Sequence, residues 1–340
     1  MAYKSFENIT LNDKLYSKEE VLNRDIEQNH YGEVLAFLQE WFSDSSEIMV
    51  QTSGSTGVPK QISIPKQSFV ESAKSTCSYL NLDSKTNSLL CIPVKYIGGK
   101  MMVIRALVSE YNLWITEPSS SPLVEFDKPI DFLAITPMQA QNCLIDSAEK
   151  LRKINQVIIG GGAVNNNFIS KISDFNNQFY STYGMTETVS HIALKKLNGT
   201  NKSDFFELLP SYSVSVNKEN CLVIDCPSLF PEEIVTNDMV ELTTTGFKWL
   251  GRKDNVINSG GIKISPEEIE VKIKSFYPRL NFYVTSKKDD LLGEKVVLIS
   301  EKEIKLDFDQ MALYKYQIPK EVLIQKITKT ETGKIKRERF

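Results

Sequence analysis

The sequence contains few of the residues that mark several common kinds of functional site. It has only two histidines, His30 and His191, so a histidine-rich metal centre is excluded and only these two are candidates for an imidazole base. Its five cysteines are scattered and form no CxxC pair, which argues against a disulfide framework and against a zinc knuckle. Any chemistry is therefore expected to depend on lysine, arginine, carboxylates and backbone amides.

Long apolar runs and a strong excess of charge are also missing. No run approaches the roughly 18 apolar residues that a membrane span needs. The start, MAYKSFENITLNDK, has no apolar stretch of the kind found in a secretory signal. Lys and Arg number 40 against 43 Asp and Glu, and the resulting formal net charge of -3 argues against general nucleic-acid binding. We therefore expect a soluble cytoplasmic protein with no membrane span and no nucleic-acid partner.

The chain has 340 residues, of which 41% are hydrophobic, and this length suggests about two domains. From Glu47 to about Lys195, short apolar runs alternate with amphipathic segments, which is typical of an α/β fold with a largely parallel sheet. Ligands bind beyond the carboxyl ends of the strands in such sheets. Glycines follow four predicted strands, at Gly54, Gly98, Gly160 and Gly184, so a binding site is expected there.

Two further regions complete the predicted organisation. Short apolar runs from about Ser211 to Leu250 predict a small antiparallel layer. A new strand, helix and strand pattern then begins, and its helix opens with Pro266 and two glutamates that suit the first turn. We place a boundary near Asp254, which divides the chain into a large domain of residues 1–253 and a small α+β domain of residues 254–340.

The strongest local motif combines hydroxyls, glycines and a lysine directly after a predicted strand. Glycines let backbone N–H groups turn toward an anion, hydroxyls add donors, and a lysine adds a positive charge, so the motif has the composition of a triphosphate cradle. A flexible polar turn is the alternative interpretation. The spacing is not GxxxxGK[ST], which argues against a P-loop ATPase. The motif is Thr52-Ser53-Gly54-Ser55-Thr56-Gly57-Val58-Pro59-Lys60, with Gln61 after it.

Three weaker motifs follow along the chain. In Tyr183-Gly184-Met185-Thr186-Glu187-Thr188 a hydroxyl and a carboxylate could bind a phosphate oxygen and Mg²⁺, or they could cap a following helix. Asp238 and Arg252 could grip ribose hydroxyls, or they could be a turn former and a surface charge. Lys334 follows a glycine in a basic C-terminal run, which indicates either a turn presenting one lysine or a solvated tail.

Taken in order from about Met49 to the last residue, these motifs resemble the adenylate-forming superfamily of acyl-CoA synthetases, peptide-synthetase adenylation domains and luciferases. The resemblance implies a large domain with a mainly parallel sheet and a small antiparallel layer, followed by a small mobile domain. It also implies an ATP-dependent acid–thiol ligase that works through an acyl-adenylate, with Mg²⁺ as cofactor and coenzyme A as the expected thiol.

The resemblance further assigns roles to individual residues. It gives the triphosphate to Thr52, Ser53, Gly54, Ser55, Thr56, Gly57 and Lys60, adenine to Gly161, Gly162, Ala163, Tyr183 and Gly184, and the ribose to Asp238 and Arg252. It makes Thr186, Glu187 and Lys334 the catalytic residues, Glu187 through Mg²⁺, Asp254 the hinge, and Ser259-Gly260-Gly261 the loop that lines the thioester-forming site.

Two departures from the family pattern stand out. The chain is much shorter than typical members, and the loss is expected before the phosphate loop, which leaves a smaller sheet or a face exposed for a homo-oligomer contact. Asn237 replaces the usual glycine of the ribose motif, so the conformation of that turn is an open question.

The segments expected to border the acyl pocket contain cations or potential cations. Lys95 and Tyr96 stand where many relatives have an aromatic residue and a histidine, and Ser190 and His191 follow the adenine motif. Together with Arg105 they suggest a second carboxylate on the substrate, because a fatty-acid tunnel would be apolar. The alternative is that Lys95 is solvated, Arg105 is a helix-surface charge and His191 is structural.

The segments TYGMTETVSHIAL and Pro-Val-Lys-Tyr-Ile-Gly-Gly, with the short length, resemble the o-succinylbenzoate–CoA ligases of menaquinone biosynthesis. Their substrate has an aromatic ring and two carboxylates. Three alternatives remain: a ligase for another aryl or medium-chain acid, a ligase that loads a carrier-protein thiol, and a non-catalytic nucleotide-binding or scaffold protein.

Overall fold

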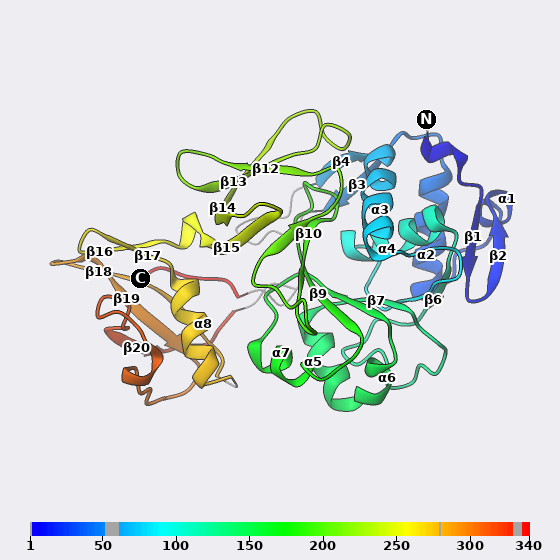
Figure 1. The fold of residues 1–340 in the computed structure, drawn as a ribbon. Coiled ribbons are helices and arrows are strands. Elements are labelled where there is room, and N and C mark those ends of the chain that lie inside the picture. Colours follow the sequence, from blue (N-terminus) through cyan, green and yellow to red (C-terminus); the bar gives the residue numbers. More distant parts are fainter. Residues whose placement is uncertain (1, 52–60, 279, 329–334) are drawn as a thin grey trace.

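The structure, a computed structural model, describes residues 2–51, 61–278, 280–328 and 335–340. A sheet of 13 strands dominates the larger part of the molecule (Figure 1). Its strands in chain order are β1 (Asn8–Leu11), β2 (Lys14–Ser17), β5 (Asn87–Leu90), β6 (Asn112–Ile115), β7 (Phe132–Ile135), β8 (Gln156–Ile159), β9 (Gln178–Gly184), β10 (His191–Lys196), β11 (Phe206–Leu208), β12 (Ser213–Val216), β13 (Cys221–Asp225), β14 (Ile234–Leu242) and β15 (Gly246–Arg252).

The core of this sheet is parallel, as the sequence predicts. Strands β1, β6, β5, β7, β8 and β9 are neighbours in that order and pair in parallel, while β2 closes one edge antiparallel to β1. Beyond β9, the strands β10, β11, β15, β14, β13 and β12 continue antiparallel. The predicted antiparallel region is therefore an extension of the main sheet. Residues 185–190 make this possible, because a short turn can join antiparallel strands but cannot make a parallel crossover.

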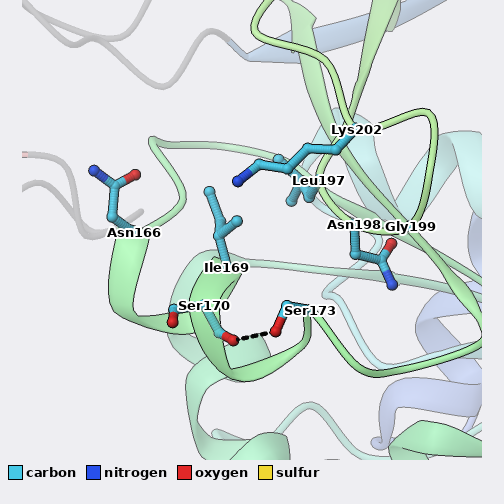
Figure 2. Close-up of a pocket in the computed structure, with 8 residues that line it drawn as sticks. All are labelled: Asn166, Ile169, Ser170, Ser173, Leu197, Asn198, Gly199 and Lys202. Carbon is cyan, nitrogen blue, oxygen red and sulfur yellow. Dashed lines mark hydrogen bonds between the residues drawn. The ribbon is translucent and has the colours of Figure 1, made fainter.

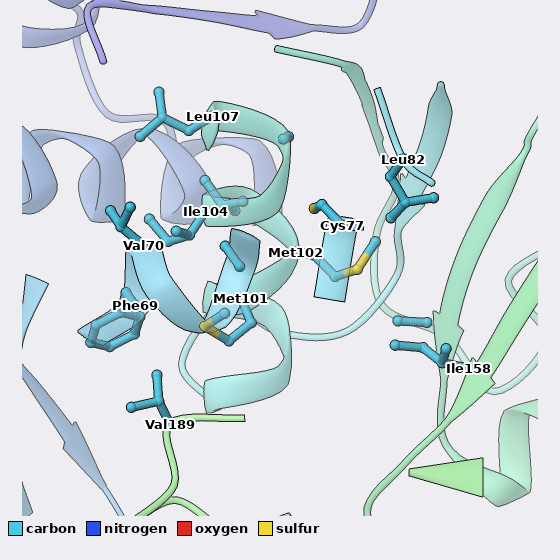
Figure 3. Close-up of a cluster of buried hydrophobic side chains, with 14 of the residues drawn as sticks. Phe69, Val70, Cys77, Leu82, Met101, Met102, Ile104, Leu107, Ile158 and Val189 are labelled. Atoms are coloured by element: carbon cyan, nitrogen blue, oxygen red, sulfur yellow. The ribbon is translucent and has the colours of Figure 1, made fainter. Parts of the chain in front are cut away.

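Helices cover both faces of the parallel strands, which explains why those strands are short continuous apolar runs. Phe132 and Ile158 belong to a core that includes α2, α3 and α4, while Leu133 and Val157 belong to a second core with α5, α6 and α7. Figure 3 shows part of the first core between α3 and α4. The helices are α1 (Lys18–Leu22), α2 (His30–Phe42), α3 (Lys66–Leu80), α4 (Ile97–Ser109), α5 (Pro137–Asp146), α6 (Ala148–Arg152) and α7 (Asn166–Lys171), preceded by the 3₁₀ turn η1 (Ala2–Ser5).

Strands β3 (Glu47–Gln51) and β4 (Gln61–Pro65) form a two-stranded antiparallel sheet of their own. The prediction that the strand before Gly54 ends within the parallel sheet is therefore wrong. The physical reason is that only one face of β3 is buried: Ile48 and Val50 point inward, while Met49 between them is 51% exposed. A strand of the parallel sheet would need two apolar faces.

A second sheet carries a hydrophobic core of its own, which includes Ile269, Phe282 and Leu298. It lies at the left of Figure 1, with α8 packed between its strands and the large sheet. We keep the boundary at Asp254 as a proposal. The elements are η2 (Lys253–Asn255), β16 (Ile257–Ser259), β17 (Ile262–Ile264), α8 (Pro266–Phe276), β18 (Phe282–Asp289), β19 (Gly293–Ser300), η3 (Asp309–Met311) and β20 (Glu321–Ile324).

Local sequence signals explain where several helices start. Ser17 and Glu20 form a reciprocal capping box at α1, and Pro266 opens α8. Thr136 caps α5, in which Pro137 takes the first position. Within the described ranges, no helix is long and apolar enough to cross a membrane.

Candidate active site

The carboxyl ends of β8 and β9 lie side by side, because Ile159 pairs with Ser181 in a parallel ladder. The exposed segment Gly161-Gly162-Ala163 follows β8, and Tyr183-Gly184 ends β9. Gly161 has a φ of +88°, in the left-handed region that glycine adopts without strain. Two of the predicted motif sites are thus brought to one edge of the sheet.

Tyr183 reaches from β9 to Asp238 on β14. Its hydroxyl donates a 2.6 Å hydrogen bond to Oδ2 of Asp238, and its ring packs edge-on against Phe247 with centroids 4.9 Å apart. Burial and the neighbouring carboxylate both raise the pKa of Tyr183, so the hydroxyl stays protonated and remains a donor. The indole Nε1 of Trp249 donates to the other oxygen, Oδ1, at 3.0 Å. Asp238 is 8% exposed.

Arg252 and Asp254 link this carboxylate to the start of the second sheet. Arg252 on β15 lies opposite Asp238 on β14 in the antiparallel ladder. Its guanidinium forms an ion pair with Asp254, with Nη2 2.7 Å from Oδ2. The amide of Asn237 donates to the same oxygen at 3.3 Å. Arg339 donates to the backbone carbonyl of Asp254 and to a second carbonyl two residues further on. The side chain that departs from the family's glycine therefore contacts the residue predicted as the hinge.

The turn after β9 is fixed by one buried hydroxyl. Oγ1 of Thr188 accepts from the amide of Met185 and lies within hydrogen-bond distance of the carbonyls of Met185 and Ser190. Val189 has a φ of +65°, which is unusual for a β-branched residue, and its buried side chain lies beside the α3–α4 core in Figure 3. The turn is thus held to the core while keeping a strained backbone.

Gly184 allows β9 to approach the start of β10 closely. A Cβ at this position would lie 2.4 Å from the carbonyl oxygen of Ser190 and 2.5 Å from Cα of His191. Only glycine fits without moving the two strands apart. The next element is strand β10, so the alternative in which Thr186 and Glu187 cap a following helix is excluded.

Thr186 is partly buried in this turn, whereas Glu187 is exposed and makes no hydrogen bond or ion pair with another described residue. In the part of the chain that the structure describes, no group of three or more His, Cys, Asp and Glu side chains could hold a metal ion. Mg²⁺ is commonly bound by one or two carboxylates together with substrate phosphates. A single free carboxylate at Glu187 fits that mode of binding.

Arg105, on α4, is 2% exposed, so it is not a helix-surface charge. Its Nη2 donates to Oγ of Ser190 at 2.7 Å, Nη1 lies 3.9 Å from Sδ of Met102, and Nε has no hydrogen-bond partner. Among the described residues, no carboxylate oxygen lies within 4 Å of its guanidinium. A buried cation without a counter-ion is costly, which makes this the most unusual charged group near the site.

His191 lies next to this guanidinium and is also buried. Its Nε2 is 3.1 Å from Oγ1 of Thr76, and its Nδ1 is 3.4 Å from Oγ of Ser190. Burial, followed by the charge of Arg105, lowers the pKa of His191 well below 6.5. The ring is therefore neutral at physiological pH, and only Arg105 supplies positive charge to this cluster.

This pKa shift predicts a pH-dependent stability. Below about pH 6.5 the unfolded chain takes up a proton on His191 that the folded chain cannot bind, so the free energy of unfolding should fall by up to about 1.4 kcal/mol per pH unit. Replacing the ring in His191→Gln should remove this part of the slope. Urea unfolding of both proteins between about pH 5 and pH 8 measures it, and identical slopes would contradict the assignment.

Lys95, another predicted acyl-pocket residue, stands apart from this cluster. Lys95 is exposed and its ammonium lies 5.1 Å from the ring centroid of Tyr96, but no contact in the described structure joins it to Arg105. The remaining predicted residues lie outside the described ranges; these are Thr52, Ser53, Gly54, Ser55, Thr56, Gly57, Lys60 and Lys334.

Sequence reasoning missed Trp249 and Thr76, and neither carries a motif that would have marked it. The sequence also gives no sign of a cavity of about 360 Å³ between α7 and the loop after β10. In this cavity the side chain of Lys202 extends toward Asn166 (Figure 2). None of the predicted site residues lines this cavity. Its lining is Asn166, Ile169, Ser170, Ser173, Leu197, Asn198, Gly199 and Lys202.

Comparison with known proteins agrees with this fold. Residues 13–231 match the family of AMP-binding enzymes, and the chain belongs to that family. It is an adenylate-forming ligase of the AMP-forming acyl-CoA ligase class. The predicted superfamily and fold are thereby confirmed.

Individual relatives narrow the similarity. The chain is 34% identical to the acyl-CoA synthetase (AMP-forming)/AMP-acid ligase II-like protein of Dyadobacter fermentans, with 94% of this chain and 96% of that chain covered and a TM-score of 0.67. It is 26% identical to the 2-succinylbenzoate–CoA ligase of Listeria monocytogenes, over 91% of this chain and 72% of the relative. The o-succinylbenzoate coenzyme A synthetase of Bacillus subtilis, solved with ATP and magnesium, shares the fold: the TM-score is 0.72 at 17% identity, with 88% of this chain and 74% of that chain covered.

Proposed function

We propose that this chain is an o-succinylbenzoate–CoA ligase that acts in menaquinone biosynthesis. The observation that carries the proposal is the buried guanidinium of Arg105, which has no carboxylate partner among the described residues. Curated relatives named 2-succinylbenzoate–CoA ligase support the same substrate.

The physical argument concerns the cost of a buried charge. Removing a guanidinium from water costs several kcal/mol unless an anion comes with it. A substrate with one carboxylate would present that group to ATP and leave Arg105 unpaired. The aromatic carboxylate of o-succinylbenzoate, which is not the one that reacts, could pair with Arg105, while the hydroxyl of Ser190 and the neutral ring of His191 offer further hydrogen bonds.

The nucleotide half of the site is proposed from the cluster at the strand ends. Tyr183 would lie against adenine beside Gly161-Gly162-Ala163, Asp238 and Arg252 would hold the ribose, and Thr186 would contact a phosphate. Glu187 would hold Mg²⁺, which supplies charge neutralisation at the phosphates when bound. Residues 52–60 and Lys334, which lie outside the described ranges, would complete the set.

These residues would support two successive steps. The aliphatic carboxylate attacks the α-phosphorus of ATP, a P–O bond forms, and pyrophosphate leaves with the electrons of the broken P–O bond. The thiol of coenzyme A then releases its proton to solvent, and the thiolate attacks the acyl carbonyl; the C–S bond forms, the acyl C–O bond breaks, and AMP leaves with its electrons. Positioning and electrostatic stabilisation supply most of the catalysis in such transfers. A rotation of the small domain about Asp254 between the steps belongs to this proposal.

The experiment that tests the proposal is pyrophosphate release with ATP, Mg²⁺ and coenzyme A over a panel of acids. The matched pair is o-succinylbenzoate and 4-oxo-4-phenylbutanoate, which lacks only the ring carboxylate. We expect kcat/KM for the diacid to exceed that for the monoacid about 100-fold, because the monoacid leaves Arg105 unpaired. Equal values, or release with the diacid in which coenzyme A is not consumed, would contradict the assignment.

A further inference from the structure

A bulge in β15 brings two side chains to the carboxylate of Asp238. Val240 pairs with Trp249, whereas Asp238 pairs with Arg252, so β15 carries one residue more than β14 over the same stretch. The extra residue is Leu250. In a regular strand, side chains three positions apart point to opposite faces, but a bulge changes this alternation. The bulge at Leu250 therefore places the side chains of Trp249 and Arg252 near the same carboxylate, that of Asp238.

The carboxylate is held by a donor on each oxygen. The hydroxyl of Tyr183 donates to Oδ2 at 2.6 Å, and the indole N–H of Trp249 donates to Oδ1 at 3.0 Å. An ionised carboxylate offers about four acceptor positions, so each oxygen can still accept one more hydrogen bond. Two further acceptors at a fixed separation suit the two neighbouring hydroxyls of a ribose.

We propose that Trp249 is a positioning residue for ribose recognition, which it serves by holding Oδ1 of Asp238 toward the nucleotide. The inference rests on the proposed role of Asp238 in ATP binding. Indole carries a donor and no acceptor, so it fixes Oδ1 through one acceptor position and leaves the other position free for a ribose hydroxyl. Trp249 is partly buried against the main core, so its ring has little freedom and the donor position is fixed.

The test is nucleotide binding at equilibrium, with AMP, 2′-deoxy-AMP and 3′-deoxy-AMP as probes. In Trp249→Phe, which keeps an aromatic ring and removes the donor, we expect AMP to bind about 10-fold more weakly. The affinity for the two deoxynucleotides should fall less, so that the ratio of AMP affinity to deoxynucleotide affinity decreases. In an Asp238→Asn background the same change should have little further effect.

Matched measurements separate this role from a structural one. Tyr79→Phe, which removes another hydrogen bond to a carboxylate, that of Glu207, controls for the loss of one such bond away from this cluster, and thermal unfolding of each variant checks the fold. An equal loss for all three nucleotides, or an unchanged preference for ribose, overturns the proposal. If the wild-type protein binds no AMP, the proposed nucleotide site is wrong. If it binds AMP but turns over a different acid, only the proposed acid substrate is wrong.

Discussion

Arg105→Met should abolish most use of o-succinylbenzoate while leaving the folded protein as stable as before, or more stable. The guanidinium is buried without a described counter-ion, so replacing it with an apolar side chain of similar length removes a desolvation cost. The same change removes the proposed partner of the substrate's second carboxylate. We expect kcat/KM for the diacid to fall by about 100-fold and that for 4-oxo-4-phenylbutanoate to fall far less.

The measurements are pyrophosphate release with both acids and urea unfolding of each protein. Arg152→Met, on α6, is a suitable control because that guanidinium is half-exposed and stacks on Phe175 at the other face of the sheet. Equal losses for diacid and monoacid would show that Arg105 supports the structure rather than the substrate. A large drop in the free energy of unfolding would point to the same conclusion.

Lys334→Ala should separate the two half-reactions. The resemblance to adenylate-forming enzymes makes this lysine the charge that stabilises the α-phosphate during attack by the carboxylate, and its position lies outside the described residues. Removing a group of this kind costs on the order of 100-fold or more in rate. Thioester formation from supplied acyl-adenylate should be retained, because the lysine is not needed in that step.

The half-reactions are measured by pyrophosphate release and by coenzyme A consumption with the synthetic adenylate. Lys336→Ala is a matched control, since Lys336 is an exposed lysine two residues away in the same basic run. Parallel losses in both half-reactions would refute the role given to Lys334, as would an equal effect of the control.

Much of the fold could be predicted because short sequence patterns indicate where individual strands and helices form. The run of residues 132–135 is apolar on both faces, which indicates a strand covered on two sides, and Thr136-Pro137 then starts a helix. The separate β3–β4 sheet and the continuation of the main sheet past β9 could not be predicted. Both depend on which strands meet in space, and a sequence pattern gives the faces of a strand but not its neighbours.

The candidate site divides in the same way. Tyr183, Asp238 and Arg252 lie in motifs that the sequence shows, and in the structure these residues lie close together. Trp249 was missed because its contact depends on a bulge, which no local signal announces. Arg105 was open to a surface interpretation, yet every residue of α4 from Gly99 to Leu107 is buried, so the helix has no polar stripe there to mark its orientation.

The carboxylate of Asp254 has a consequence for how the enzyme would cycle. It accepts from Arg252, which belongs to the proposed ribose grip, and from Asn237, which precedes Asp238 in the chain. An arginine that turns toward a bound nucleotide gives up part of its hold on Asp254. Thermodynamic reciprocity then requires that whatever loosens the proposed hinge at Asp254 also changes the affinity for the nucleotide, and by the same factor. A chain with glycine at position 237 would lack the hydrogen bond from Asn237 to Asp254, and with it one of the two contacts that couple the hinge to the nucleotide site.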